Sequence, residues 1–190
     1  FASLKNQMID SERNGYGTEL SDILLTFEEQ TAIDQKVLME RFWDMFIVDA
    51  LIGNWDRHNG NWGFLYHAHT DQMELAPVFD CGSSLYPQAD EKIMETVLTD
   101  ETELNFRVYE IPTSAIMVNG KKIKYFDFIS SVQNEDCNLA LKRILPRIDM
   151  AKIYAVIDDT PFISDLQKKF YMKMLEKRKE KILDFSFCML

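Results

Sequence analysis

Apolar residues recur at helical spacing over most of the chain, and short alternating runs interrupt this pattern in two places. Ser21 and Asp22 are residue types that begin helices, and the apolar positions after them predict a helix ending near Gln30. From Asp34 to Ile52 apolar residues fall on nearly every side of the expected helix, which predicts a helix buried almost all round. Gly53 then provides a left-handed end for this helix.

The alternating regions predict β-hairpins. Residues 62–66 and 74–79 are short β-leaning runs on either side of a polar loop at 67–72. Asn119-Gly120 is a two-residue turn signal between two further apolar runs, at 116–118 and 123–125. The polar, turn-rich segment 54–61 therefore lies between a buried helix and the first hairpin.

Helical spacing returns in the remaining segments, at about 90–104, 138–145, 149–157 and 161–184. In the last of these, Thr160 is the expected N-cap, Pro161 occupies the first turn, and Phe162 begins the apolar face. Residues 1–19 predict a short helix followed by a loop that contains Gly15 and Gly17. The expected fold class is α+β, mainly α, with one or two β-hairpins in a single domain over residues 1–190.

Composition narrows the classes of function. Of the 190 residues 46% are hydrophobic, which is enough to build one sizeable core. A formal charge of −10 repels phosphate backbones and anionic lipid, so we expect no nucleic-acid partner and no membrane partner. Three widely spaced cysteines indicate neither a disulfide framework nor a zinc site, so the default expectation is a reducing, cytoplasmic setting.

The segment after the buried helix carries the candidate chemistry. It contains Asp56-Arg57-His58-x-x-Asn61, and Asp80 follows 24 positions after Asp56, in Asp80-Cys81-Gly82. Phosphoryl transfer from a nucleotide depends on positioning and charge neutralisation. One Asp can orient a hydroxyl and take its proton, while an Asn oxygen and a second carboxylate are hard ligands of the kind that Mg²⁺ prefers.

Each of these residues also has a purely structural interpretation. An Asp in a turn is most often a cap or an Asx-turn, so Asp56 and Asp80 taken singly are ordinary turn residues. Arg57 is most simply a structural ion-pair partner, and His58 either orients a neighbour inside the protein or contacts phosphate. The joint occurrence of these residue types at this spacing favours the chemical interpretation over the structural one.

These motifs carry a resemblance to a known family. The segment Asn54–Asn61, together with Leu75-Ala76-Pro77-Val78-Phe79-Asp80, resembles the C-terminal region of the HipA-like serine/threonine kinases. Further blocks, specific to part of that family, extend the resemblance over nearly all of the chain: Phe42-Trp43-Asp44-Met45-Phe46, Gly60-Asn61-Trp62-Gly63-Phe64-Leu65, Leu85-Tyr86-Pro87-Gln88-Ala89-Asp90 and Pro146-Arg147-Ile148-Asp149-Met150.

The resemblance implies a protein-kinase-like C-lobe that uses ATP and Mg²⁺ and acts on a protein hydroxyl. On it, Asp56 matches the catalytic Asp, and His58 and Asn61 lie in the loop that contacts nucleotide phosphate and metal. Asp80 matches the metal-binding Asp, with Phe79 beside it at the nucleotide. Cys81 stands where ordinary protein kinases have the Phe of Asp-Phe-Gly, and it is too small to act as the Phe switch of regulated kinases.

The nucleotide lid is not apparent in this sequence. The seven glycines form no G-x-G-x-x-G or Walker-type loop before the catalytic segment, and Lys5 and Lys36 lie in helical stretches instead of a strand. The chain begins Phe1-Ala2-Ser3, without an initiator Met. We therefore expect a C-lobe whose partner is its own N-lobe, and which is inactive without it.

Two other functions stay open at this point. Phosphoinositide kinases also use D-R-H-x-x-N followed by an Asp-containing metal motif, so a lipid or small-molecule kinase is one alternative. A non-catalytic pseudokinase or interaction module is the other, although Asp56, Asn61 and Asp80 are all present. Secretion also stays open, because the resemblance extends to a secreted member of the family.

Overall fold

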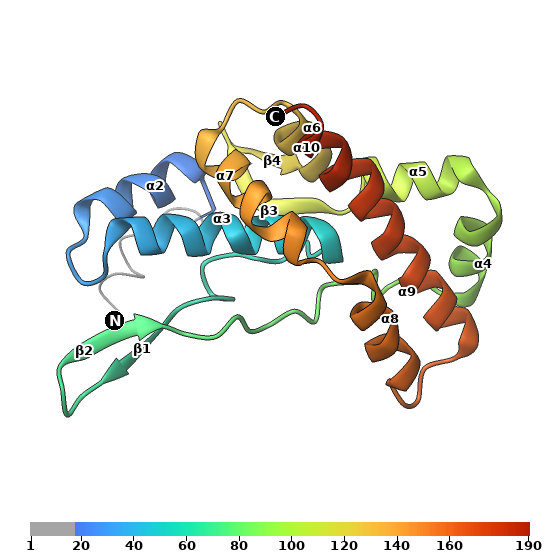
Figure 1. Cartoon of the computed structure of the whole chain (residues 1–190), viewed down its shortest axis with the longest axis horizontal. Coiled ribbons are helices and arrows are strands. Elements are labelled where there is room, and N and C mark those ends of the chain that lie inside the picture. Colours follow the sequence, from blue (N-terminus) through green and yellow to red (C-terminus); the bar gives the residue numbers. More distant parts are fainter. Residues whose placement is uncertain (1–17) are drawn as a thin grey trace.

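The structure is a computed structural model that describes residues 18–190. Its helices are α2 (Leu20–Glu29), α3 (Gln35–Ile52), α4 (Glu91–Thr99), α5 (Glu101–Tyr109), α6 (Tyr125–Ser130), α7 (Glu135–Ile144), α8 (Met150–Asp159), α9 (Asp165–Arg178) and α10 (Phe185–Phe187). Its strands are β1 (Phe64–His67), β2 (Gln72–Leu75), β3 (Thr113–Val118) and β4 (Lys121–Lys124). The predicted α+β, mainly α, class is confirmed (Figure 1). The short helix and glycine loop expected before residue 18 lie outside the described residues.

Helix α3 lies at the centre of the molecule (Figure 1). It packs against α2, α7, α9 and the π-helical turn Lys179–Asp184, which explains why apolar residues are needed on almost every face. The Asp34 side chain caps its start by accepting from the Val37 N–H, and Gly53 ends it with φ of +68°. Both ends thus follow the sequence prediction, and the left-handed end turns the chain directly into the segment 54–61.

Aromatic side chains form much of the core around α3. Trp43 is 1% exposed, contacts Phe42 and Phe46 edge-on, and stacks on Phe128 with ring centroids 5.7 Å apart. Phe46 also meets Tyr125 at 5.2 Å. Edge-on and offset ring pairs of this kind add to the stability gained from burying their area. These ring contacts therefore hold α3 against α6.

Two antiparallel hairpins follow the predicted order, with shifted boundaries. In the first, Phe64 pairs with Leu75, so the strands begin and end a few residues away from the predicted runs. This hairpin extends away from the helices (Figure 1). The second turns at Asn119 and Gly120, which have φ of +53° and +74° as a tight hairpin turn requires. Both backbone N–H groups at this turn donate to the Glu19 carboxylate, at 2.7 and 3.0 Å.

Three helix boundaries differ from prediction, and in two of them a side-chain cap decides where the helix begins. Helix α2 begins at Leu20, before the predicted capping residues. The predicted helix 90–104 is two helices, because Asp100 ends α4 and its carboxylate then accepts from two N–H groups of α5. Helix α9 begins after Ser164, which forms a capping box with Gln167, so Phe162 is fully exposed and does not share the apolar face. Helix α6 was not predicted.

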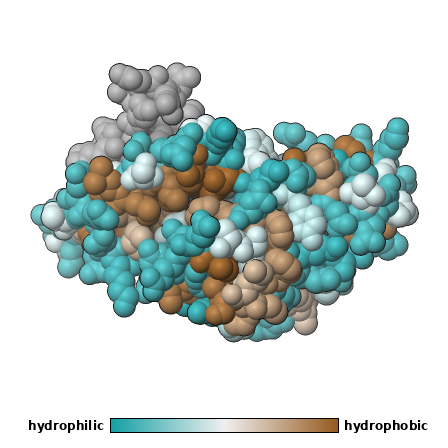
Figure 2. Space-filling model, turned by 90° about the horizontal axis from the view of Figure 1, so that it is seen from above, coloured by the Kyte–Doolittle hydropathy of each residue, from teal (hydrophilic) through white to brown (hydrophobic). Residues whose placement is uncertain are grey.

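The surface is divided between polar and apolar regions. Figure 2 shows hydrophilic residues over most of the periphery of one face and hydrophobic residues gathered across its middle. Within residues 18–190, no helix is both long and apolar enough to cross a membrane. Of the three cysteines, Cys81 and Cys188 are exposed, while Cys137 is 1% exposed.

Candidate active site

A buried ion pair forms the floor of the site. Arg57 donates to Asp49 of α3 through two nitrogens, Nε to Oδ2 at 2.9 Å and Nη2 to Oδ1 at 3.1 Å. Asn54 Nδ2 adds a third hydrogen bond to this carboxylate at 3.0 Å, and the Asn54 carbonyl accepts from the Tyr125 hydroxyl at 2.5 Å. The segment 54–61 is thus fixed to the end of α3 from below, and the prediction that Arg57 is an ion-pair partner is confirmed.

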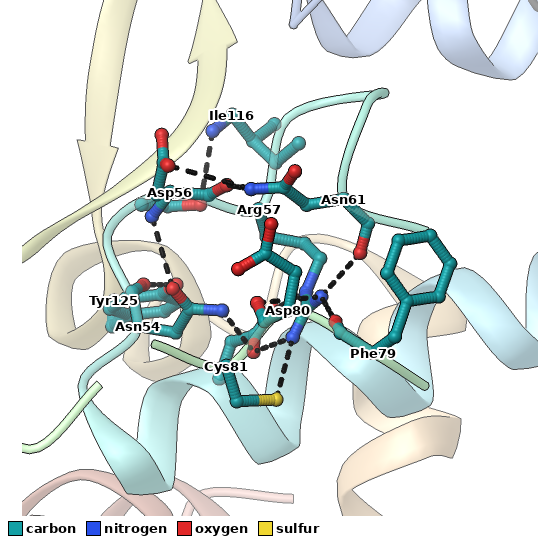
Figure 3. Close-up of polar contacts among 11 residues, drawn as sticks. Asn54, Asp56, Arg57, Asn61, Phe79, Asp80, Cys81, Ile116 and Tyr125 are labelled. Carbon is teal, nitrogen blue, oxygen red and sulfur yellow. Dashed lines mark hydrogen bonds and ion pairs between the residues drawn. The ribbon is translucent and has the colours of Figure 1, made fainter. Parts of the chain in front are cut away.

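The second arm of the same guanidinium joins two loops that are distant in sequence. Arg57 Nη1 donates to the carbonyls of Asn61 and Phe79, both at 2.5 Å, and more weakly to that of Asp80 at 3.4 Å. Its Nη2 also contacts Cys81 Sγ at 3.3 Å. One buried side chain therefore positions the backbone of Asn61 next to that of Asp80 (Figure 3).

Asp56 and Asn61 face each other across the turn. Asn61 Nδ2 donates to the Asp56 carbonyl at 2.8 Å and to its Oδ2 at 3.4 Å. The Asp56 side chain is 38% exposed, so its carboxylate is accessible from solvent. The amide nitrogen of Asn61 is directed at Asp56, so the amide oxygen of Asn61 points away from Asp56 (Figure 3).

His58 closes the turn between these residues. Its Nδ1 accepts from the Gly60 N–H at 2.9 Å, which leaves Nε2 to carry the proton of the neutral ring, 3.9 Å from Asp56 Oδ1. A side chain at position 60 would put its Cβ 2.6 Å from His58 Cε1. Glycine at this position therefore lets the imidazole lie against the backbone.

Asp80 is exposed, and its backbone has φ of +54°, a left-handed conformation that few residues other than glycine adopt. Its carboxylate projects into the space between the Arg57 and Asn61 side chains (Figure 3). The Phe79 ring is 43% exposed beside it. Among the described residues no group of three or more His, Cys, Asp or Glu side chains is placed to hold a metal ion.

The match between this chain and known proteins covers both loops. Residues 3–159 match the family described as the HipA-like C-terminal domain. The chain belongs to the HipA-like C-terminal domain family. It is 51% identical over 187 residues to the serine/threonine-protein kinase CtkA of Helicobacter pylori, an alignment that covers 98% of this chain and 58% of that protein.

Comparison of this structure with solved structures gives a similar protein to the sequence comparison. A crystal structure of a Helicobacter pylori proinflammatory kinase CtkA matches with a TM-score of 0.93 and 49% identity, over 100% of this chain and 69% of that chain. The predicted family resemblance is confirmed. This HipA-like chain spans little more than half the length of the curated relative.

Charge and burial act against each other at the floor of this HipA-like site. Burial raises the pKa of Asp49, and the hydrogen bonds and charge of Arg57 oppose that rise. Burial alone would lower the pKa of Arg57, but the hydrogen bonds and charge of Asp49 raise it above its ordinary value. The guanidinium therefore stays charged, and its role is to hold the loops in place.

Three residues of this arrangement were missed by sequence reasoning, namely Asp49, Asn54 and Tyr125. Asp49 carries the one available signal, because a carboxylate within an otherwise apolar helix, eight residues before an Arg, is a candidate buried partner for it. Asn54 lies in the recognised motif, but its side chain points down to Asp49 and not to the site. Tyr125 is 71 residues away from the carbonyl to which it donates, and nothing in the sequence connects the two.

Proposed function

We propose that this chain is the C-terminal catalytic lobe of an ATP- and Mg²⁺-dependent serine/threonine protein kinase. The observation that carries the proposal is the Arg57 link, which holds the Asp56–Asn61 turn and the Asp80 loop in one fixed arrangement. The name of the relative CtkA, a serine/threonine-protein kinase, supports the same reaction and a protein as the acceptor.

Asp56 is proposed as the catalytic base. Its carboxylate is accessible and accepts from Asn61 Nδ2, so it is oriented before an acceptor hydroxyl arrives. A carboxylate in this position orients the serine or threonine hydroxyl and takes its proton as the new P–O bond forms and the bond between the γ-phosphorus and ADP breaks, with ADP as the leaving group. His58 and Phe79 are proposed to contact the nucleotide, through the imidazole at the phosphates and through the exposed ring beside Asp80.

The donor atoms fit magnesium. Asn61 offers an amide oxygen and Asp80 a carboxylate, and Mg²⁺ is typically held by one or two protein carboxylates or amides together with water and substrate phosphates. When bound, Mg²⁺ neutralises charge on the phosphates of ATP. The protein contribution is to hold the two oxygen donors at the same side of the site, which the backbone contacts of Arg57 do.

A nucleotide lid is proposed to come from a separate N-lobe. The relative is longer than this chain, and the described part of the site is formed by loops whose carboxylates reach solvent. Residues 1–190 alone are then expected to have no measurable kinase activity, while the full-length protein phosphorylates a protein acceptor.

Radiolabel transfer from ATP by the full-length protein tests this function. Asp56→Asn should lower turnover by about 10²–10⁴-fold, the usual contribution of a positioned general base. Asp71→Asn is the matched control, since Asp71 is an exposed carboxylate in the β1–β2 turn whose φ of +52° asparagine tolerates. Asp80→Asn should raise the Mg²⁺ concentration required for half-maximal activity. Full activity of Asp56→Asn, or label transferred to lipid and not to protein, would overturn the proposal.

A further inference from the structure

A surface hollow lies beside the proposed catalytic loop, with Trp55 in its wall. It has a volume of about 490 Å³, within the range of small-ligand and side-chain pockets. Trp55, Tyr86, Pro87, Arg107, Pro112 and Lys122 are among the residues that line it. These residues come from the catalytic loop, from the segment after Asp80, from α5 and from the β3–β4 hairpin.

The hollow is fixed next to Asp56 by the course of the chain. Trp55 directly precedes Asp56 and forms part of the wall. The segment that follows Asp80 returns to the end of α3, where the Leu85 N–H donates to the Ile52 carbonyl at 2.9 Å. Tyr86 is thereby held opposite the start of the catalytic loop, so a chain crossing Asp56 can reach the hollow with a neighbouring side chain.

The charged residues that line the hollow are all positive. Arg107 and Lys122 line it, and no Asp or Glu does. The acidic residue that directly follows α5, Glu110, is engaged by Lys124 at 2.6 Å. Among the described residues, neither Arg107 nor Lys122 forms an ion pair, and Arg107 Nε is buried without a hydrogen-bond partner. The lining of the hollow is therefore positively charged, although the chain as a whole has a formal charge of −10.

A third cationic side chain, that of Arg178, contacts the lining of the hollow from inside the protein. Arg178 is 1% exposed and donates to the Tyr86 hydroxyl at 3.0 Å and to the Arg107 carbonyl at 3.3 Å. Its hydrogen-bond partners are all neutral, and its Nη2 has none among the described residues. The Tyr86 hydroxyl in turn donates to the Arg107 carbonyl at 2.5 Å, so hydrogen bonds join Arg178, Tyr86 and Arg107. Buried cations without a counter-ion are costly, and an anion in the hollow lowers that cost.

The backbone at the edge of the hollow is strained. Leu85 and Tyr86 are consecutive residues with φ of +57°, in the left-handed region that side chains with a Cβ rarely occupy. Such a conformation is unfavourable for residues with a Cβ, and it persists where the surrounding contacts enforce it. Strain of this kind gathers at ligand-binding segments, which agrees with a binding role for this one.

We propose that this hollow binds an acidic side chain of the protein substrate, a carboxylate or a phosphorylated residue, located close to the acceptor hydroxyl in the substrate chain. The proposal rests on the proposed kinase function, because the acceptor must be held at Asp56. Arg107 and Lys122 supply the charge, the Trp55 and Tyr86 rings form apolar walls, and the flanking prolines keep the opening rigid. The hollow thus makes acidic sequences preferred substrates of a strongly acidic protein.

Short serine peptides with Glu, phosphoserine, Ala or Lys at each position around the acceptor test the preference, with the full-length protein as enzyme. At one position, Glu or phosphoserine should raise kcat/KM by about tenfold over Ala, as expected for charge-assisted hydrogen bonds. Lys122→Glu should remove this preference and favour the Lys peptide. Lys121→Glu is the control, since Lys121 is the adjacent residue of β4 and does not line the hollow. The Glu and phosphoserine peptides show which kind of acid is preferred.

Binding to the full-length Asp56→Asn variant separates this proposal from the kinase function. The backbone and indole N–H signals of Trp55 should shift with the acidic peptide and not with its Lys version, and Lys122→Glu should abolish the shift. If binding behaves so while no peptide is phosphorylated by the wild type, only the kinase function fails. If peptides are phosphorylated without regard to charge and Lys122→Glu changes nothing, the acidic pocket is wrong and the kinase function stands.

Discussion

Replacing Arg57 by Ala tests whether one guanidinium holds the two loops of the site together. The Arg57 and Asp49 side chains are 6% and 2% exposed, and their closest atoms are 2.9 Å apart. Removing one partner leaves a buried carboxylate with only the hydrogen bond from Asn54. Loss of one member of a buried ion pair costs about 3–5 kcal/mol in the free energy of unfolding.

Arg143→Ala is the matched control. Arg143 also pairs with an aspartate of α3, Asp44, at 2.7 Å, but these two side chains are 34% and 26% exposed. A pair of this exposure contributes about 0.2–1 kcal/mol. Each variant removes an arginine that pairs with an aspartate of α3, so the difference between them isolates the effect of burial and of the contacts with the loops.

Urea unfolding, followed by the fluorescence of the buried tryptophans, measures both changes. The reasoning fails if Arg57→Ala loses no more stability than Arg143→Ala. A double variant, Asp49→Leu with Arg57→Met, extends the test: apolar replacement of both partners should recover most of the stability, because no buried charge remains. Kinase activity of the full-length protein should stay low in this double variant, since the link to the Phe79 and Asp80 carbonyls is lost. Recovered activity would show that the link is dispensable.

Two further predictions concern single positions. Gly60→Ala should leave the thermal midpoint almost unchanged, since residue 60 is exposed, but lower turnover by about ten- to a hundredfold because the new Cβ displaces the His58 ring; equal loss of stability and activity would contradict this. Burial raises the pKa of the Cys137 thiol to about 12, so at pH 8 a disulfide reagent should modify the two exposed cysteines at once and Cys137 only after unfolding. Three equal rates would contradict the described burial.

Most of the order of elements was readable from the sequence, because buried helices and tight turns leave local patterns. Gly53 and Asn119-Gly120 have the residue types that their backbone angles require, and both were predicted. The break at Asp100 was not, since the apolar pattern continues across it and only a side-chain cap decides where the helix stops. Likewise Thr160-Pro161 and Ser164 both begin helices well, and the capping box with Gln167 selects the second.

The site was predictable only as far as its motifs. Asp56, Asn61 and Asp80 stand out because few residue types suit that chemistry at that spacing. What holds them is spread over the chain, at Asp49 and Tyr125, where the partners become visible only once the helices are packed. The cationic hollow could not be predicted for the same reason, because its positive charges lie in α5, β4 and α9, at positions that look like ordinary surface residues.

The position of Arg178 has a consequence for how the protein is made. Its Nε donates to the Ala50 carbonyl at 2.7 Å, across 128 residues of chain. During synthesis, α3 and the segment after it leave the ribosome long before α9 does, and the apolar faces of α3 then have no partner. The packing around the end of α3 is therefore completed late, and a ribosome that pauses before α9 holds a chain that is prone to aggregate and in need of a chaperone.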